Sequence, residues 1–185
     1  MLFLPFFDFI LQLDIKQNKI DIKYLFKIFS EKIVGRDLMG VVCGFCGHSD
    51  APESLRIELK ETIADLIRKK NVHLFYVGNH GGFDRMVLGV LQELQASFPV
   101  MRYYVVLAYH PQLSAPVSHD APTIFPEDLE TVPKRAAIPR RNKWLVEHSD
   151  YLVSYVVRSF GGAAQTLAYA ERRNVRIIRL KAGKT

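Results

Sequence analysis

Short apolar runs rich in β-branched and aromatic residues alternate with longer amphipathic segments along most of this 185-residue chain, from residue 38 onward. Such alternation is typical of βαβ units, which build a parallel sheet with helices on both faces. The runs predict strands at residues 39–44, 73–78, 101–108, 151–156 and 175–180, and the intervening segments predict helices at 52–70, 83–97, 139–149 and 162–173. We therefore expect an α/β protein, a three-layer sandwich with a mostly parallel sheet of about five strands.

The first 38 residues do not follow this pattern, so we expect an appended N-terminal segment at 1–38 and one α/β domain at 39–181. Part of the segment has the spacing of the apolar face of a basic helix: Ile22, Leu25, Phe26, Phe29 and Ile33. Two explanations fit. Either the translation start is placed upstream of a true start at Met39, or the segment is a helix that docks on a partner or a membrane surface.

The net charge of +6 is concentrated toward the carboxyl end, because residues 134–185 hold 12 Lys and Arg against 3 Asp and Glu. A basic end on a near-neutral body indicates a partner that carries phosphate, either a nucleotide or a nucleic acid. Alternatively, these Lys and Arg side chains are scattered over the surface, where water solvates them, and they mark no binding site.

Two cysteines, Cys43 and Cys46, are too few for a disulfide framework, so a reducing, cytoplasmic location is expected. No apolar run reaches the ~20 residues that cross a bilayer, and the amino end lacks the features of a signal peptide.

The Cys-x-x-Cys spacing suggests a redox pair, but five residues separate it from Pro52, which suits the first turn of the next helix. Zinc would need a fourth ligand besides the cysteines and His48, so no metal site is expected and buried thiols are favoured.

Residues 110–133 contain five prolines and several acidic residues, which predicts a long surface excursion with little regular structure. A segment of this kind is a candidate lid over a ligand site.

Three expected strands end in glycine-containing turns, whose backbone N–H groups are suited to bind an anion. Because the carboxyl ends of parallel strands meet at one edge of a sheet, these turns predict one ligand site. Glycines that serve only the turn, an Asp that caps a helix, and small residues that pack a helix on the sheet are the plainer alternatives. The candidate binding residues are Gly44, Gly47, His48 and Ser49 after the first strand, Gly78, Gly82 and Asp84 after the second, and Gly161, Gly162, Ala163 and Thr166 after the fourth.

A basic segment adds to this site: Arg140, Arg141 and Lys143 can meet phosphate charge, and Asn142 can contact a sugar or base.

Four segments, CGHS at 46–49, GNHGGFD at 78–84, RNKWLVEHSDYLV at 141–153 and GGAAQTLAYA at 161–170, resemble the YpsA-like branch of the SLOG superfamily, which unites DprA and Lonely Guy proteins. The resemblance implies a Rossmann-like fold with a pocket for a nucleotide or ADP-ribose-like ligand. Apart from such a bound ligand, the sequence predicts no specific cofactor. The positions that match the motifs of the family are Gly47, Gly78, Gly82, Asp84, Arg141, Asn142, Gly161, Gly162 and Thr166. The chain departs from the family at Ser49, where Arg is usual, and at Phe160, where Pro is usual, so the affinity or orientation of a bound anion differs there.

Lonely Guy proteins resemble the chain at Arg141 and the glycine pair, but the Glu that they use to cleave an N-glycosidic bond is missing, since no carboxylate follows the glycines before Glu171. We therefore expect a nucleotide-derivative binding protein with a sensing or regulatory role rather than an enzyme. A phosphoribohydrolase resembling Lonely Guy is one alternative, and a DprA-like single-stranded nucleic-acid binder that uses the basic end is another. A homo-oligomer fits each of these readings.

Overall fold

The computed structural model describes residues 40–110 and 121–181, which form one parallel sheet covered by helices. The strands lie in the order β4-β3-β2-β1-β5-β6, and every neighbouring pair is parallel. Their bounds are β1 Val41–Gly47, β2 Val72–Val77, β3 Arg102–Val106, β4 Thr123–Ile124, β5 Tyr151–Tyr155 and β6 Arg176–Arg179. The expected α/β sandwich is confirmed, with six parallel strands where about five were predicted.

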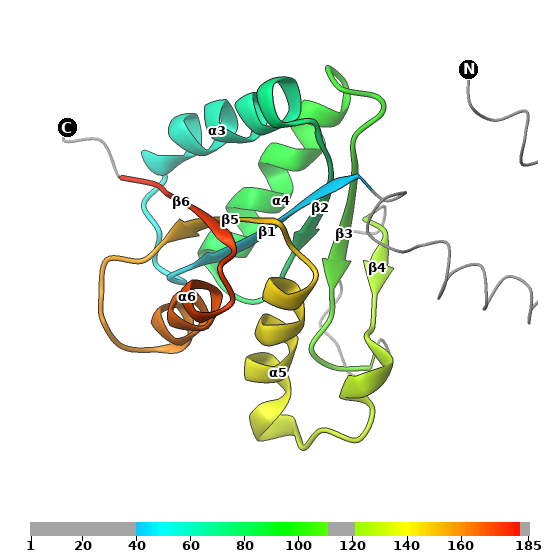
Figure 1. Cartoon of the computed structure of the whole chain (residues 1–185), viewed down its shortest axis with the longest axis vertical. Helices are drawn as coiled ribbons and strands as arrows, with labels where there is room; N and C mark the ends of the chain where they lie inside the picture. Colours follow the sequence, from blue (N-terminus) through cyan, green and yellow to red (C-terminus); the bar gives the residue numbers. More distant parts are fainter. Residues whose placement is uncertain (1–39, 111–120, 182–185) are drawn as a thin grey trace, which may run out of the picture. The chain divides into compact units, whose positions relative to one another are not determined.

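In the described part of the chain, four helices form the outer layers: α3 Leu55–Lys70, α4 Gly82–Gln95, α5 Lys134–Glu147 and α6 Gly162–Arg172. Helices α3 and α4 cover one face of the sheet, and α5 and α6 cover the other (Figure 1). This arrangement is the Rossmann-like, three-layer architecture expected from the sequence.

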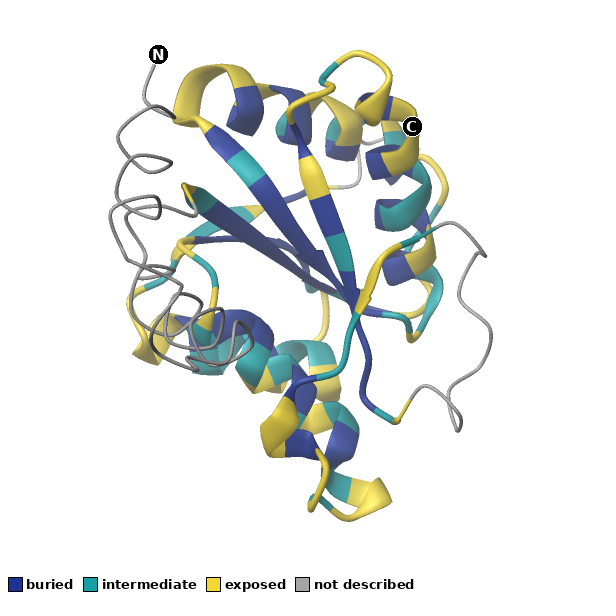
Figure 2. Cartoon of the chain, turned by 90° about the vertical axis from the view of Figure 1, so that its right-hand side faces the viewer, coloured by how far each residue is buried: buried dark blue, intermediate teal, exposed yellow. Residues whose placement is uncertain are grey.

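The core lies on both faces of the central strands, which are mostly buried (Figure 2). Side chains of a strand alternate between the two faces. In β1, Cys43 and Phe45 therefore pack under α3 and α4, whereas Val42 and Cys46 pack on the opposite face, under α5 and α6. A chain buried on both faces in this way reads as continuous apolar runs, which is why the strands were recognisable in the sequence.

Several element boundaries differ from the prediction. Strand β1 continues to Gly47, three residues beyond its predicted end, and α3 begins at Leu55, three residues after its predicted start at Pro52, so the turn between them is shifted along the chain to residues 48–54. Helix α5 begins at Lys134 after an extended Pro133, and Pro139 lies inside the helix rather than in its first turn. Strand β4 and the short 3-10 helix η2, Glu127–Leu129, are the regular elements in the described part of the proline-rich segment, for which little regular structure is predicted.

The expected N-terminal segment at 1–38 and the middle of the proline-rich excursion lie outside the described residues. Within the described part of the chain, no helix is long and apolar enough to cross a membrane.

Candidate functional site

A cavity of about 410 Å³ opens at the carboxyl edge of the sheet, beside strands β1 and β5. The chain builds β1 to β4 outward in one direction and then returns to place β5 against the other side of β1, so the strand order reverses between these two strands. Ligands of open α/β sheets bind at such a reversal, outside the carboxyl ends of the strands. The lining comes from residues 45–49 of β1 and its loop, His80 and Asp84 near the start of α4, Ile138, Arg141, Asn142 and Leu145 of α5, and Arg158 with residues 160–163 before and in α6.

The most buried cation of the site is Arg141, whose side chain is only 2 % exposed. Its Nη1 donates a hydrogen bond of 3.0 Å to the carbonyl oxygen of Val106 at the end of β3. Its Nε has no hydrogen-bond partner, although it is buried. A buried donor left unpaired costs about 1–3 kcal/mol, so the described protein groups do not satisfy this guanidinium fully.

Asp84 faces Arg141, and its Oδ2 lies 3.9 Å from the guanidinium Nη2. The same oxygen accepts a hydrogen bond of 3.0 Å from the backbone N–H of His80. Burial raises the pKa of this carboxyl, and the charge of Arg141 and the hydrogen bond from His80 oppose that effect. Burial also lowers the pKa of Arg141, against the attraction of Asp84. The pair is therefore two buried charges held in a loose contact.

Gly78 has no side chain, and this leaves room for the side chains of Arg141 and Asp84. A Cβ at Gly78 would lie 2.2 Å from both Arg141 Nη1 and Asp84 Oδ2, which is inside any real contact distance. Gly78 does not line the cavity, so its part in the site is to admit the charged pair.

The amino end of helix α6 opens on the cavity. Gly161, with φ of 92°, is the N-cap residue, and no side chain caps the helix. No atom lies within 4 Å of a Cβ placed at Gly161 or Gly162. The first N–H groups of a helix lack partners within it and carry partial positive charge, so this open end is suited to an anion.

Helix α4 also begins after a glycine with positive φ, but the space beside this helix start is occupied by another part of the chain. Gly81 has φ of 103°, and the N–H of Gly82 donates a hydrogen bond of 2.9 Å to the carbonyl oxygen of Ser49. A Cβ at Gly82 would lie 2.4 Å from that oxygen. Of the two glycine pairs, the one at α6 therefore has room for a ligand.

Asn142 joins the two helices at the cavity wall. Its Nδ2 donates a hydrogen bond of 3.2 Å to Thr166 Oγ1, and that hydroxyl donates one of 2.7 Å to the carbonyl oxygen of Gly162. Asn142 and Thr166 thereby fix the first turn of α6 against α5. Thr166 is buried behind this turn and does not line the cavity.

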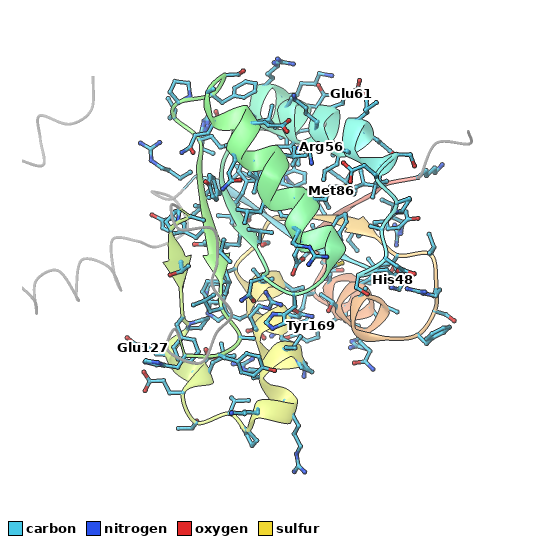
Figure 3. The ribbon with its side chains drawn as sticks, turned by 180° about the vertical axis from the view of Figure 1, so that it is seen from behind. His48, Arg56, Glu61, Met86, Glu127 and Tyr169 are labelled. Atoms are coloured by element: carbon cyan, nitrogen blue, oxygen red, sulfur yellow. The ribbon has the colours of Figure 1, made fainter. Side chains whose placement is uncertain are left out.

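A second set of contacts fixes the loop that leads into α6. The backbone N–H of Arg158 donates a hydrogen bond of 3.1 Å to Nε2 of His48, which is labelled in Figure 3 on the loop after β1. The guanidinium of Arg158 donates two hydrogen bonds to Asp50, of 2.9 and 2.7 Å. Burial and the nearby charge of Arg158 lower the pKa of His48, so its ring is neutral at pH 7 and its Nε2 is free to accept. Asp50 therefore helps to hold the loop that leads into α6.

Nine of the predicted binding residues line the cavity: Gly47, His48, Ser49, Asp84, Arg141, Asn142, Gly161, Gly162 and Ala163. Four do not: Gly44, Gly78, Gly82 and Thr166. Gly44 was expected in a phosphate-binding turn, but it lies within β1, where a Cβ would meet Ser149 Oγ at 2.6 Å. Its role is close packing of the sheet against the end of α5.

Sequence reasoning missed several residues of the lining: Phe45, Cys46, His80, Ile138, Leu145, Arg158 and Phe160. Arg158 and Phe160 shortly precede the glycine pair that was recognised, and His80 lies in the loop between β2 and α4 beside Gly81, so closeness to recognised glycines was an available signal for all three. The other four belong to a strand and a helix whose apolar pattern indicates only a core.

Cys43 and Cys46 are buried free thiols on opposite faces of β1, so they cannot pair with each other. Burial raises the pKa of both thiols, that of Cys46 to about 12. Among the described residues, no group of three or more His, Cys, Asp or Glu side chains is placed to hold a metal ion.

The fold is similar to that of DNA processing protein A (DprA). The X-ray structure of DprA from Streptococcus pneumoniae matches with a TM-score of 0.58 at 10% sequence identity, over 75% of this chain and 50% of that chain. A structure of DprA from Helicobacter pylori, described for its single-stranded DNA binding mode, matches with a TM-score of 0.50 at 11% identity, over 75% of this chain and 64% of that chain. No protein-family model and no curated protein matches the sequence. At this identity, and with this chain spanning half to under two thirds of the DprA chains, the likeness establishes a shared DprA-like Rossmann fold alone.

Proposed function

We propose that this chain is a YpsA-like member of the SLOG group that binds a nucleotide derivative such as ADP-ribose and acts in sensing or regulation. The observation that carries the proposal is that the buried Arg141, whose guanidinium has an unpaired Nε, lines the same cavity as the uncapped start of α6. Each feature favours an acceptor with negative charge, and together they match a phosphate.

The size and composition of the cavity fit a small molecule. Its volume of about 410 Å³ lies within the usual range of small-molecule sites, roughly 300–1,000 Å³. Two guanidinium groups, Arg141 and Arg158, line it against one carboxylate, Asp84, among the described residues. In the proposed pose, phosphate lies over residues 161–163 and ribose hydroxyls lie near Asp84 and Asn142.

Binding without turnover is the form of this function that the lining favours. Hydrolysis of a glycosidic bond normally uses two carboxyl groups, or a carboxylate beside the anomeric carbon. Asp84 is held against Arg141, and Glu171, the first acidic residue after the glycine pair, forms an ion pair with Arg179 on the surface.

Isothermal titration of the full chain with ADP-ribose tests this proposal. Gly162→Leu is the informative variant, because its side chain enters open space at the cavity and leaves the fold unstrained. We expect binding by the wild type, a loss of at least about tenfold in the variant, and unchanged binding in Gly89→Ala, an interior position of α4. Absence of binding, or equal binding by Gly162→Leu, would overturn the site. Release of adenine or nicotinamide from AMP, ADP-ribose or NAD, followed by chromatography, would instead identify an enzyme.

Single-stranded DNA is the second candidate ligand, and a specific surface favours it. The cations of Lys143, Arg172 and Arg173 lie 5.4–5.9 Å from the ring centre of Tyr169, which is labelled in Figure 3. A basic surface around an aromatic ring suits a phosphate backbone with stacked bases. A shift of single-stranded DNA that weakens steeply with salt, and that Arg172→Glu abolishes while Gly162→Leu does not, would support this candidate.

A further inference from the structure

The ring of Phe160 is exposed at the edge of the cavity. Its side chain is 70% exposed, and Phe160 is one of four large hydrophobic residues with exposed side chains among the described residues. The other three, Ile57, Val100 and Val157, do not line the cavity. The second phenylalanine of the lining, Phe45, is buried and stacks on Phe75, so its ring is already used by the core.

The segment that carries this ring is held in place. The guanidinium of Arg158 lies over the Phe160 ring, with its Cζ 5.9 Å from the ring centre. Arg158 is itself fixed by its two hydrogen bonds to Asp50 and by its backbone bond to His48. The exposed ring therefore sits on a positioned backbone rather than on a free loop.

Phe160 is also next to the groups that suit an anion. It directly precedes Gly161, the N-cap of α6, so the aromatic surface and the open helix end are consecutive along the chain. A ligand that places phosphate on this helix end brings its adjoining groups close to Phe160. Aromatic side chains stack on nucleobases because every base presents a π face.

We propose that Phe160 is a stacking surface for the base of the ligand, so that the site prefers a nucleotide to the corresponding base-free sugar phosphate. This inference rests on the proposed function, since it places the base of the same bound molecule. Phe160 is then a specificity-determining residue of this chain.

The test compares ADP-ribose with ribose 5-phosphate by isothermal titration on the full chain. Loss of one base–aromatic stack corresponds to a weakening of about 5- to 100-fold. We expect Phe160→Ala to weaken ADP-ribose by that factor and to leave ribose 5-phosphate unchanged. Phe160→Trp should retain ADP-ribose, and Ile57→Ala, an equally exposed apolar side chain away from the cavity, should change neither.

A spectroscopic readout separates stacking from a general effect on the fold. Ring currents shift the H2 and H8 resonances of a stacked adenine upfield, so this shift should be present with the wild type and Phe160→Trp and absent with Phe160→Ala. If Phe160→Ala weakens both probes equally, weakens neither, or changes only the oligomeric state in size-exclusion chromatography, the stacking proposal is wrong while the proposed function stands. If the wild type binds neither probe, the proposed function itself fails.

Discussion

Arg141 Nη2 lies 3.9 Å from Asp84 Oδ2, and the two side chains are 2 % and 11 % exposed. Removing one member of a buried pair leaves the other charge uncompensated, which costs about 3–5 kcal/mol in well-formed pairs. This pair is at the long limit of contact, so Asp84→Ala should lower the free energy of unfolding by about 3 kcal/mol, the lower end of that range. Urea denaturation of the wild type and the variant measures this change in the free energy of unfolding.

The matched control for Asp84→Ala is the double variant Asp84→Ala with Arg141→Met, which removes both charges. It should recover part of the loss, because a buried apolar side chain needs no counter-ion. A double variant that loses the sum of the two single losses would show that the two side chains are independent.

Gly78→Ala should destabilise the protein because its Cβ would overlap both members of this charged pair. Overpacking of a filled site costs about 1–3 kcal/mol. Gly89→Ala in α4 is the matched control, since its Cβ would lie 3.6 Å from its nearest neighbour, Arg56. That change should raise stability by about 0.5–1 kcal/mol, the usual gain from replacing Gly in a helix. We expect the urea midpoint of Gly78→Ala to lie below that of the wild type and the urea midpoint of Gly89→Ala to lie above it.

His48 should make stability depend on pH between the mildly acidic and neutral range. Burial and the charge of Arg158 lower its pKa below the ordinary value of 6.5 for histidine, so the unfolded chain binds a proton that the folded chain resists. Its contribution to stability is therefore complete above pH 6.5 and is lost as the pH falls toward the lowered pKa. The slope for one proton is at most about 1.4 kcal/mol per pH unit.

Thermal unfolding of the wild type and His48→Gln from pH 5 to 8 measures this contribution. His80 also has a lowered pKa, caused by burial and by Arg141, so the variant should keep a smaller slope of the same sign. Equal slopes in the two proteins would show that protonation of His48 does not oppose folding.

Much of this architecture was predictable from the pattern of apolar residues, and the exceptions have physical causes. Strands β1, β2, β3 and β5 are mostly buried runs, and the edge strand β6 is partly exposed but keeps an apolar centre at Ile177 and Ile178. Strand β4 has only two residues, of which Thr123 is exposed, and so leaves no periodic signal. The sequence predicts that a helix begins at Pro139, a position that suits proline because it usually breaks a helix interior. The structure accommodates it in the sixth position of α5.

The edge of the sheet that holds the candidate site was also predictable, because glycine turns follow parallel strands. The difference between the two glycine pairs could not be predicted from the sequence. Gly82 and Gly162 look alike in the sequence, and only the carbonyl of Ser49 beside Gly82 separates the filled helix start from the open one. Likewise, no local pattern indicates that Arg158 binds Asp50, 108 residues away.

Cys43 and Cys46 should resist both alkylation and oxidation in the folded protein. Their thiols are buried, and their pKa values are raised by that burial, so the reactive thiolate is scarce at pH 8. Ellman's reagent should detect no thiol in the native chain and two thiols in denaturant. Mild oxidation should leave the mass unchanged, and rapid reaction of either native thiol would contradict the buried placement.

Segments that are far apart in the sequence form the walls of the cavity. For example, His48 and Arg158, which are joined by a hydrogen bond, are 110 residues apart in the sequence. Closing so long a loop costs conformational entropy, which the contacts between β1 and β5 must offset before any binding surface exists. A growing polypeptide would therefore form this cavity only after almost the whole domain has been synthesised. If the proposed ligand binds there, it stabilises only finished molecules and protects them from proteolysis.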